Sequence, residues 1–169
     1  MLYNINMKVI KAPTHRESDY DDNLKVFLGG SIEMGNATDW QDQLISRYKN
    51  HNVTFWNPRR DDWDSSWSQD PTVGSPFNEQ VTWEMDAQDE ADAIVYYFDP
   101  NTTSPITLLE LGSYGDFNSI VCCPDGYFRK GNVEMFCKRY DIPFVHTFDD
   151  LVSRLNEIVY ADELRKETE

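Results

Sequence analysis

Short apolar runs alternate with amphipathic segments along most of the chain. Five runs rich in Val, Ile, Phe and Tyr are typical of buried strands. The expected strands cover residues 25–30, 53–58, 92–99, 119–125 and 142–148. Between and after these runs, apolar residues recur at the spacing of one helical face. The expected helices cover residues 37–50, 76–91, 106–117, 131–141 and 149–167.

This alternation predicts an α/β fold. Parallel strands need crossover connections, and helices are the usual ones, so the pattern predicts a five-stranded parallel sheet with helices on both faces. We expect residues 25–169 to form a single domain. Residues 1–24 form an N-terminal extension, in which the segment MKVIKAP is a candidate for an additional edge strand.

Loops at the carboxyl ends of parallel strands are the expected ligand-binding positions. The first of these loops contains GGSIEMG, at residues 29–35. Its glycines allow close approach of a ligand to the backbone, but a tight turn explains them equally well. The segment has neither the GxGxxG spacing nor a Walker motif. Glu33 also disfavours a phosphorylated ligand at this loop.

Charge and cysteine content narrow the classes of partner. The chain has 30 acidic residues against 15 Lys and Arg, a net charge of -15, which disfavours binding to nucleic-acid phosphates. The odd number of cysteines, 3, without CxxC spacing indicates neither a disulfide framework nor a zinc site. No segment has the length and apolarity of a membrane span or a signal peptide. We therefore expect a cytoplasmic protein without a metal site.

The segment PITLLELG places one carboxylate, Glu110, among aliphatic residues. Glu110 either faces solvent from a helix or is kept in a dry pocket, where burial would raise its pKa. A carboxylate in such a pocket can attack an electrophilic sugar carbon while a second acid assists the leaving group. Glu84, on the preceding expected helix, is the candidate second acid, although helical acids usually form a solvated face.

The loop NPRRDDWD contains further candidates for ligand contacts. Trp63 and the nearby Trp67 either stack on a flat ring or cover the core. Arg59 either shapes a pocket or pairs with neighbouring aspartates on the surface.

Several short motifs occur together in a characteristic order: FLGGSIEMG, NPRR, a helix with WE, ADAIVYYFD and ELG. Over about residues 25–147, the chain thereby resembles the nucleoside 2-deoxyribosyltransferase family, and in particular its deoxyribosyltransferase-like branch. This resemblance implies a flavodoxin-like doubly wound fold. It also implies exchange of nucleobases on 2-deoxynucleosides, without a metal or an organic cofactor.

The resemblance implies a role for each matched position. Glu110 matches the nucleophile that holds a covalent deoxyribosyl intermediate, and Glu84 matches an acid that contacts the base. Ser104, or Thr103, stands where the family usually has an Asp that touches the base. Asn132 matches an Asn that a neighbouring subunit lends to the sugar, which implies a homo-oligomer, a dimer or larger.

Other positions belong to the loops that would surround such a substrate. The expected substrate contacts are Gly30, Ser31, Ile32, Arg59 and Trp63, beside Ser104 and Asn132. Family members usually carry a Tyr on the first strand, whose hydroxyl positions the nucleophile. Phe27 stands there in this chain, so Tyr114 or Ser31 would have to supply the hydroxyl.

Three other functions fit the same residues. One is an N-glycoside hydrolase that acts on nucleosides or their monophosphates, with water in place of the second base. Another is a non-catalytic module that binds a nucleoside or nucleotide. A flavin-binding protein is the weakest alternative.

Overall fold

The computed structural model describes residues 6–16, 21–32, 37–64, 66–116 and 118–168. Its strands are β1 Lys8–Lys11, β2 Leu24–Gly30, β3 Val53–Asn57, β4 Ala93–Tyr97, β5 Ser119–Cys122 and β6 Phe144–Val145. Its helices are α1 Trp40–Ile45, η2 Ser46–Tyr48 (a short 3₁₀ helix), α2 Pro76–Glu90, α3 Pro105–Tyr114, α4 Lys130–Arg139 and α5 Phe148–Thr168.

The described strands form one parallel sheet with the order β1-β3-β2-β4-β5-β6. Strands β2 to β6 follow the flavodoxin-like order, so the expected α/β doubly wound fold is confirmed. The expected number of five strands is wrong. The sixth strand is β1, which comes from the N-terminal extension and pairs with the outer side of β3.

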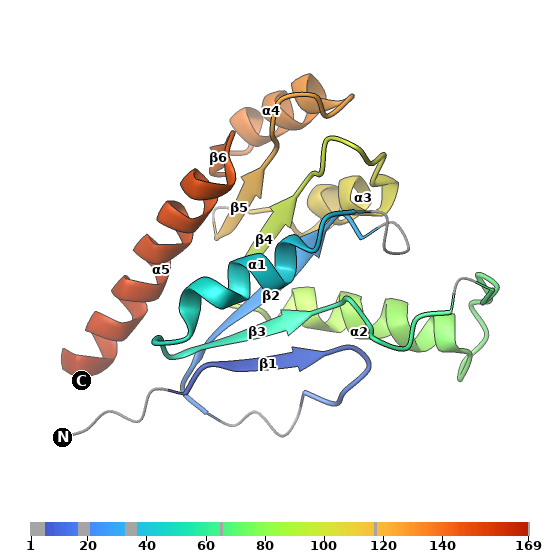
Figure 1. The fold of residues 1–169 in the computed structure, drawn as a ribbon, viewed down its shortest axis with the longest axis horizontal. Helices are drawn as coiled ribbons and strands as arrows, with labels where there is room; N and C mark the ends of the chain where they lie inside the picture. The colour runs from blue at the N-terminus through green and yellow to red at the C-terminus, as the bar shows by residue number, and fades with distance from the viewer. Residues whose placement is uncertain (1–5, 17–20, 33–36, 65, 117, 169) are drawn as a thin grey trace.

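Helices cover both faces of the sheet (Figure 1). On one face, α1 and α5 pack against the strands through a core that includes Leu44 and Leu155. On the other face, α2, α3 and α4 build a second core that includes Trp83, Leu111 and Cys137. This second face holds the two acidic residues singled out from the sequence, since Glu84 lies in α2 and Glu110 lies in α3.

The last strand is much shorter than its apolar run predicts. The run at residues 142–148 contains only the two-residue strand β6. Pro143 has no N–H to donate to a sheet. At the other end, the Thr147 hydroxyl accepts a hydrogen bond from the Asp150 N–H (3.1 Å) and opens α5. The apolar run therefore predicted the position of the strand correctly but predicted too many residues for it.

The segment that follows β1 fastens α2 to the edge of the sheet. The Arg16 guanidinium lies 5.2 Å from the ring centroid of Trp56 and 5.2 Å from that of Trp83. It also donates a hydrogen bond to the Trp83 carbonyl (2.8 Å). In return, the Trp83 indole N–H donates to the carbonyl of Thr14 (2.8 Å). Since Trp83 precedes Glu84, these contacts fix the helix that carries one of the candidate acids.

Candidate functional site

The chain reverses its winding direction between β2 and β4, where flavodoxin-like sheets form their ligand crevice. Gly30 ends β2 with φ of +146°, and a Cβ there would lie 2.5 Å from the Tyr97 carbonyl oxygen. The Ser31 N–H donates to that same carbonyl (2.9 Å). Gly30 therefore allows the ends of β2 and β4 to approach each other. Of the two explanations considered for this glycine, a ligand contact or a tight turn, these contacts fit the tight turn.

Three hydroxyl groups join the loops that follow β2 and β4. Ser31 Oγ lies 2.8 Å from Thr102 Oγ1 and 2.5 Å from Ser104 Oγ. Thr102 Oγ1 and Ser104 Oγ are 2.7 Å apart, and Ser104 is only 4% exposed. The structure thus places Ser31 and Ser104 together, with their hydroxyls bonded to each other. Ile32 follows as a half-buried residue, and Glu33 lies outside the described residues.

Asp99 adds a carboxylate beside the ends of β2 and β4. Its Oδ2 accepts a hydrogen bond from the Thr38 N–H (3.0 Å), and its Oδ1 accepts one from the Asn101 N–H (2.9 Å). Burial acts to raise the pKa of Asp99, but these hydrogen bonds prevail and lower it. A fixed negative charge therefore lies beside the ends of these strands, and it would repel a phosphate group.

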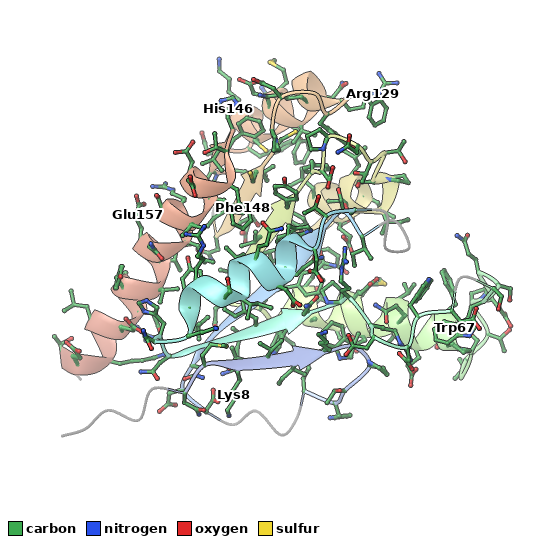
Figure 2. All side chains as sticks on the ribbon, in the orientation of Figure 1. Lys8, Trp67, Arg129, His146, Phe148 and Glu157 are labelled. Carbon is green, nitrogen blue, oxygen red and sulfur yellow. The ribbon has the colours of Figure 1, made fainter. Side chains whose placement is uncertain are left out.

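Arg59 and Trp63 both engage parts of the protein itself. Arg59 Nη2 donates to the Ala37 carbonyl (3.2 Å), and Nη1 lies 3.6 Å from Asp39 Oδ2. Trp63 packs edge-on against Trp67, with ring centroids 5.2 Å apart. Figure 2 shows Trp67 in the loop beside the N-terminal end of α2. Base stacking by Trp63 remains a prediction.

Helices α2 and α3 bring the two candidate acids together. Gln80, Glu84 and Gln88 are spaced by four residues along α2 and therefore share one face. Gln80 Nε2 donates to Glu84 Oε1 (2.7 Å). Across the helix interface, Gln88 Nε2 donates to Glu110 Oε1 (3.1 Å). Each half-buried carboxyl is thus held by the amide of a buried Gln.

This setting shifts the titration of both acids upward. Burial raises the pKa of Glu84 to about 7, against the opposing effect of the hydrogen bond from Gln80. Burial, followed by repulsion from the Glu84 charge, raises the pKa of Glu110 to about 8, against the hydrogen bond from Gln88. Two neighbouring carboxyls in a poorly solvated site resist ionising together, so the pair retains a proton near neutral pH.

A tyrosine from the sheet completes the surroundings of Glu110. The Tyr96 hydroxyl lies 3.0 Å from Gln88 Oε1 and 3.4 Å from the backbone carbonyl oxygen of Glu110. Phe27 is fully buried, and its ring centroid lies 6.4 Å from that of Trp83.

Sequence reasoning missed Gln80, Gln88 and Tyr96. The four-residue spacing on α2 was the available signal for the two glutamines. Tyr96 gave no such signal, because an aromatic residue inside an apolar strand is usually a core residue.

Asn132 lies on α4, apart from the two candidate acids. It is exposed on α4 and lines a groove of about 170 Å³ between α3 and α4. In Figure 1, α3 lies between α2 and α4, so the groove and the glutamine face of α2 flank α3 from different sides. Within one chain, the structure therefore brings Glu84 and Glu110 together and places Asn132 apart from them.

The described residues contain no group of three or more His, Cys, Asp or Glu that could hold a metal ion. None of the helices in the described part of the chain is long and apolar enough to cross a membrane.

Comparison with known proteins assigns the family. No curated protein matches the sequence. A family model described as nucleoside 2-deoxyribosyltransferase like matches residues 23–127, well over half of the 169 residues. The matched segment contains both Glu84 and Glu110 and ends before Asn132. The chain therefore belongs to the nucleoside 2-deoxyribosyltransferase-like family.

Proposed function

We propose that this protein transfers a 2-deoxyribosyl group between nucleobases, through a covalent glycosyl intermediate on Glu110 and with retention of configuration. The observation that carries this proposal is the carboxyl pair of Glu84 and Glu110, held between α2 and α3 by two glutamine amides. Retaining glycosyl transfer uses a pair of carboxyls, one as the nucleophile and one, with a raised pKa, as the proton donor.

In the first half-reaction, a carboxylate oxygen of Glu110 attacks the anomeric carbon of the deoxynucleoside. The bond from that carbon to the base nitrogen breaks, and its electron pair stays with the base. Protonated Glu84 gives its proton to the departing base, which leaves as a neutral molecule. The sugar is then esterified to Glu110, with its configuration inverted once.

In the second half-reaction, a nitrogen of the incoming base attacks the same carbon from the opposite side of the ester. The ester bond breaks, and its electron pair returns to Glu110 as a carboxylate. Glu84, now ionised, takes the proton that the incoming base must lose. Two inversions give net retention, and both acids return to their starting states.

Without substrate, the pKa of about 7 for Glu84 and about 8 for Glu110 places the retained proton on Glu110. The reactive state has this proton on Glu84 and leaves Glu110 ionised, so substrate binding must move the proton from one carboxyl to the other. Gln88 favours the charged form of Glu110 by donating a hydrogen bond to it (3.1 Å). The positive charge that develops on the sugar also favours this arrangement, because an anionic carboxylate beside it stabilises the transition state. The proton retained by the pair is then available to the leaving base.

The charges of the protein favour a neutral substrate. The net charge is -15, and Asp99 places a hydrogen-bonded carboxylate beside the ends of β2 and β4. Both features would repel a nucleotide phosphate. We therefore propose nucleosides and free nucleobases, in place of nucleoside monophosphates, as the substrates.

We also propose that the active form is a homo-oligomer in which Asn132 of one subunit reaches the sugar bound by another. Two observations support this proposal. Asn132 is exposed and lines the groove between α3 and α4. Helices α3 and α4 also expose the large apolar residues Ile106, Leu109 and Met135. Covering them with a second copy would remove apolar surface from water.

An exchange assay tests the proposed reaction. The pure protein would be incubated with deoxyinosine or thymidine, with and without free adenine, and the products separated by chromatography. Glu110→Ala removes the nucleophile, and Glu134→Gln, on the exposed face of α4, is a matched control for loss of a carboxylate. The expected result is new deoxyadenosine with the wild type and with Glu134→Gln, and none with Glu110→Ala.

The other outcomes separate the competing functions. Free base without deoxyadenosine, lost in Glu110→Ala, would identify a hydrolase. No reaction with any nucleoside or monophosphate would leave a binding module. A quenched reaction adds a direct readout, because intact mass spectrometry should show one deoxyribosyl adduct on the protein and fragmentation should map it to Glu110.

A further inference from the structure

The carboxyl group of Glu110 depends on a chain of two hydrogen-bonded side chains. Gln88 Nε2 donates both to Glu110 Oε1 (3.1 Å) and to the Glu84 backbone carbonyl (3.2 Å). Gln88 is only 4% exposed, so water cannot easily replace these partners. An amide has one preferred orientation when both of its N–H groups donate hydrogen bonds and its oxygen accepts one.

Tyr96 supplies that partner for the oxygen. Its hydroxyl donates to Gln88 Oε1 (3.0 Å), which is nearer than the other acceptor in reach, the Glu110 carbonyl oxygen (3.4 Å). Tyr96 is the fourth of the five residues of β4 and is fully buried. Burial raises the pKa of Tyr96 far above its ordinary value, so the phenol keeps the proton that it donates. With its oxygen held by Tyr96, the Gln88 amide must direct its N–H groups toward α3 and the Glu84 carbonyl.

We infer that Gln88 and Tyr96 are positioning residues for Glu110. The Tyr96 hydroxyl fixes the amide of Gln88, and that amide holds the Glu110 carboxyl in one orientation and stabilises its charged form. The role of Glu110 as the attacking group rests on the proposed function, whereas the hydrogen-bonded chain does not. Phe27, on the neighbouring strand β2, has no hydroxyl and therefore cannot position Glu110 in this way.

Ser31 and Tyr114, the two residues that the sequence offered as the source of this hydroxyl, differ in their contacts. The Ser31 hydroxyl is engaged with Thr102 and Ser104 in the loop cluster. Tyr114 shares α3 with Glu110 and is half-buried. Among the described residues, the titratable groups that interact electrostatically with Glu110 are Glu84 from α2, Tyr96 from β4 and Tyr114 from its own helix.

Two conservative variants break the chain of hydrogen bonds at different links. Tyr96→Phe removes the hydroxyl and keeps the ring, and Gln88→Met removes the amide and keeps the length of the side chain. Hydrogen bonds to charged groups affect equilibria by about 10- to 100-fold. We expect kcat for transfer to fall by this factor in Gln88→Met and by less in Tyr96→Phe, with KM changed by less than about threefold.

A titration without substrate supplies the decisive readout. With ¹³C-labelled glutamate carboxyls, the NMR signal of Glu110 is assigned by its loss in Glu110→Gln. Removing a donor to the charged form should raise the pKa of Glu110 by about one unit in Gln88→Met and by a smaller amount in Tyr96→Phe. Tyr114→Phe is the competing variant and should change the pKa of Glu110 and kcat by less than either Gln88→Met or Tyr96→Phe.

The inference is overturned if Gln88→Met and Tyr96→Phe keep the wild-type titration of Glu110, or if Tyr114→Phe shows the loss in their place. If Gln88→Met does not fold, Tyr96→Phe decides, because it leaves the packing of the ring unchanged. If the wild type catalyses no transfer, the proposed function fails, while the titration still tests the chain of hydrogen bonds.

Discussion

The ring of Tyr96 lies directly over the backbone of Gly29. A Cβ on Gly29 would lie 2.9 Å from both Cδ1 and Cε1 of that ring, closer than atoms in well-packed proteins approach. Residues Gly29 and Tyr96 are also register partners in the β2–β4 pairing. Because Gly29 has no side chain, the Tyr96 ring can occupy the space above it and place its hydroxyl beside Gln88.

Replacing this glycine should disturb the site through the tyrosine. In Gly29→Ala, the added methyl group must displace the Tyr96 ring or the strand, at a cost of about 1–3 kcal/mol in the free energy of unfolding. Urea unfolding measures this cost. The control is Gly131→Ala, where nothing lies within 4 Å of the added Cβ. Equal stability of the two variants would contradict the close contact.

The stability of the protein should fall as pH rises toward 8. Glu84 and Glu110 titrate normally near 4.5 when unfolded, and in the folded protein burial raises their pKa values to about 7 and about 8. Between pH 4.5 and about pH 8, the folded state binds more protons than the unfolded state. The stabilising effect is therefore present below pH 4.5 and is lost as pH rises through 7 to 8.

Neutral replacements should remove this pH dependence. Glu84→Gln and Glu110→Gln are each expected to raise the free energy of unfolding at pH 8 by roughly 1–3 kcal/mol and to change it little at pH 4.5. Thermal unfolding from pH 4.5 to 8.5 measures the effect. The exposed control Asp89→Asn should follow the wild-type curve. Parallel curves for all four proteins would show that the two carboxyls are not buried as described.

The role of Glu84 can be tested by changing the leaving group. Glu84→Gln cannot donate a proton, so transfer from a natural deoxynucleoside should fall by about 100-fold or more. A 2-deoxyriboside with a leaving group of low basicity, such as a nitrophenolate, needs no proton. The first half-reaction with that substrate should fall by less than about tenfold. An equal loss with both substrates would contradict proton donation by Glu84.

Subunit complementation tests the position of Asn132. Glu110→Ala and Asn132→Ala should each be nearly inactive as separate proteins. In a mixed dimer, one site would combine an intact Glu110 from one chain with an intact Asn132 from the other. After unfolding and refolding an equal mixture, we expect roughly a quarter of wild-type activity, because half the dimers carry one working site. A mixture no more active than its parents would contradict the shared site.

Arg16 should be important for stability although it lies in the N-terminal extension. Arg16→Ala removes the cation from between Trp56 and Trp83 and the hydrogen bond to the Trp83 carbonyl (2.8 Å). We expect a loss of about 1–3 kcal/mol in the free energy of unfolding, measured with urea. Arg47→Ala, at an exposed position, is the control and should have an effect within about 0.5 kcal/mol.

The order of elements could be predicted because apolar periodicity is a local property of the sequence. The helix expected at residues 76–91 is α2, Pro76–Glu90. Ser75 caps it by accepting a hydrogen bond from the Asn78 N–H (3.0 Å), which fits the proline at its start. Edge strands carry a weaker signal. In β1, pairing with β3 depends on a distant segment, so the sequence pattern alone could not decide it.

For the candidate site, the sequence could single out individual residues but not the contacts between them. Glu110 drew attention because a carboxylate among aliphatic residues is unusual. Its contact with Gln88 crosses from α2 to α3, and neither helix alone indicates which residues face each other. Trp63 shows the same limit, because its packing against Trp67 depends on the path of a loop that has no periodic pattern.

The sheet ends in very short strands on both sides. β1 has four residues, including Lys8 and Lys11, and β6 has two. The longer strands β2, β3 and β4 each have neighbours on both sides, so their backbone groups are already paired. A foreign chain would therefore find little free strand edge on which to add itself, and it would meet lysines at β1. We expect the folded protein to resist strand-to-strand aggregation, even though its sheet is built from strongly apolar segments.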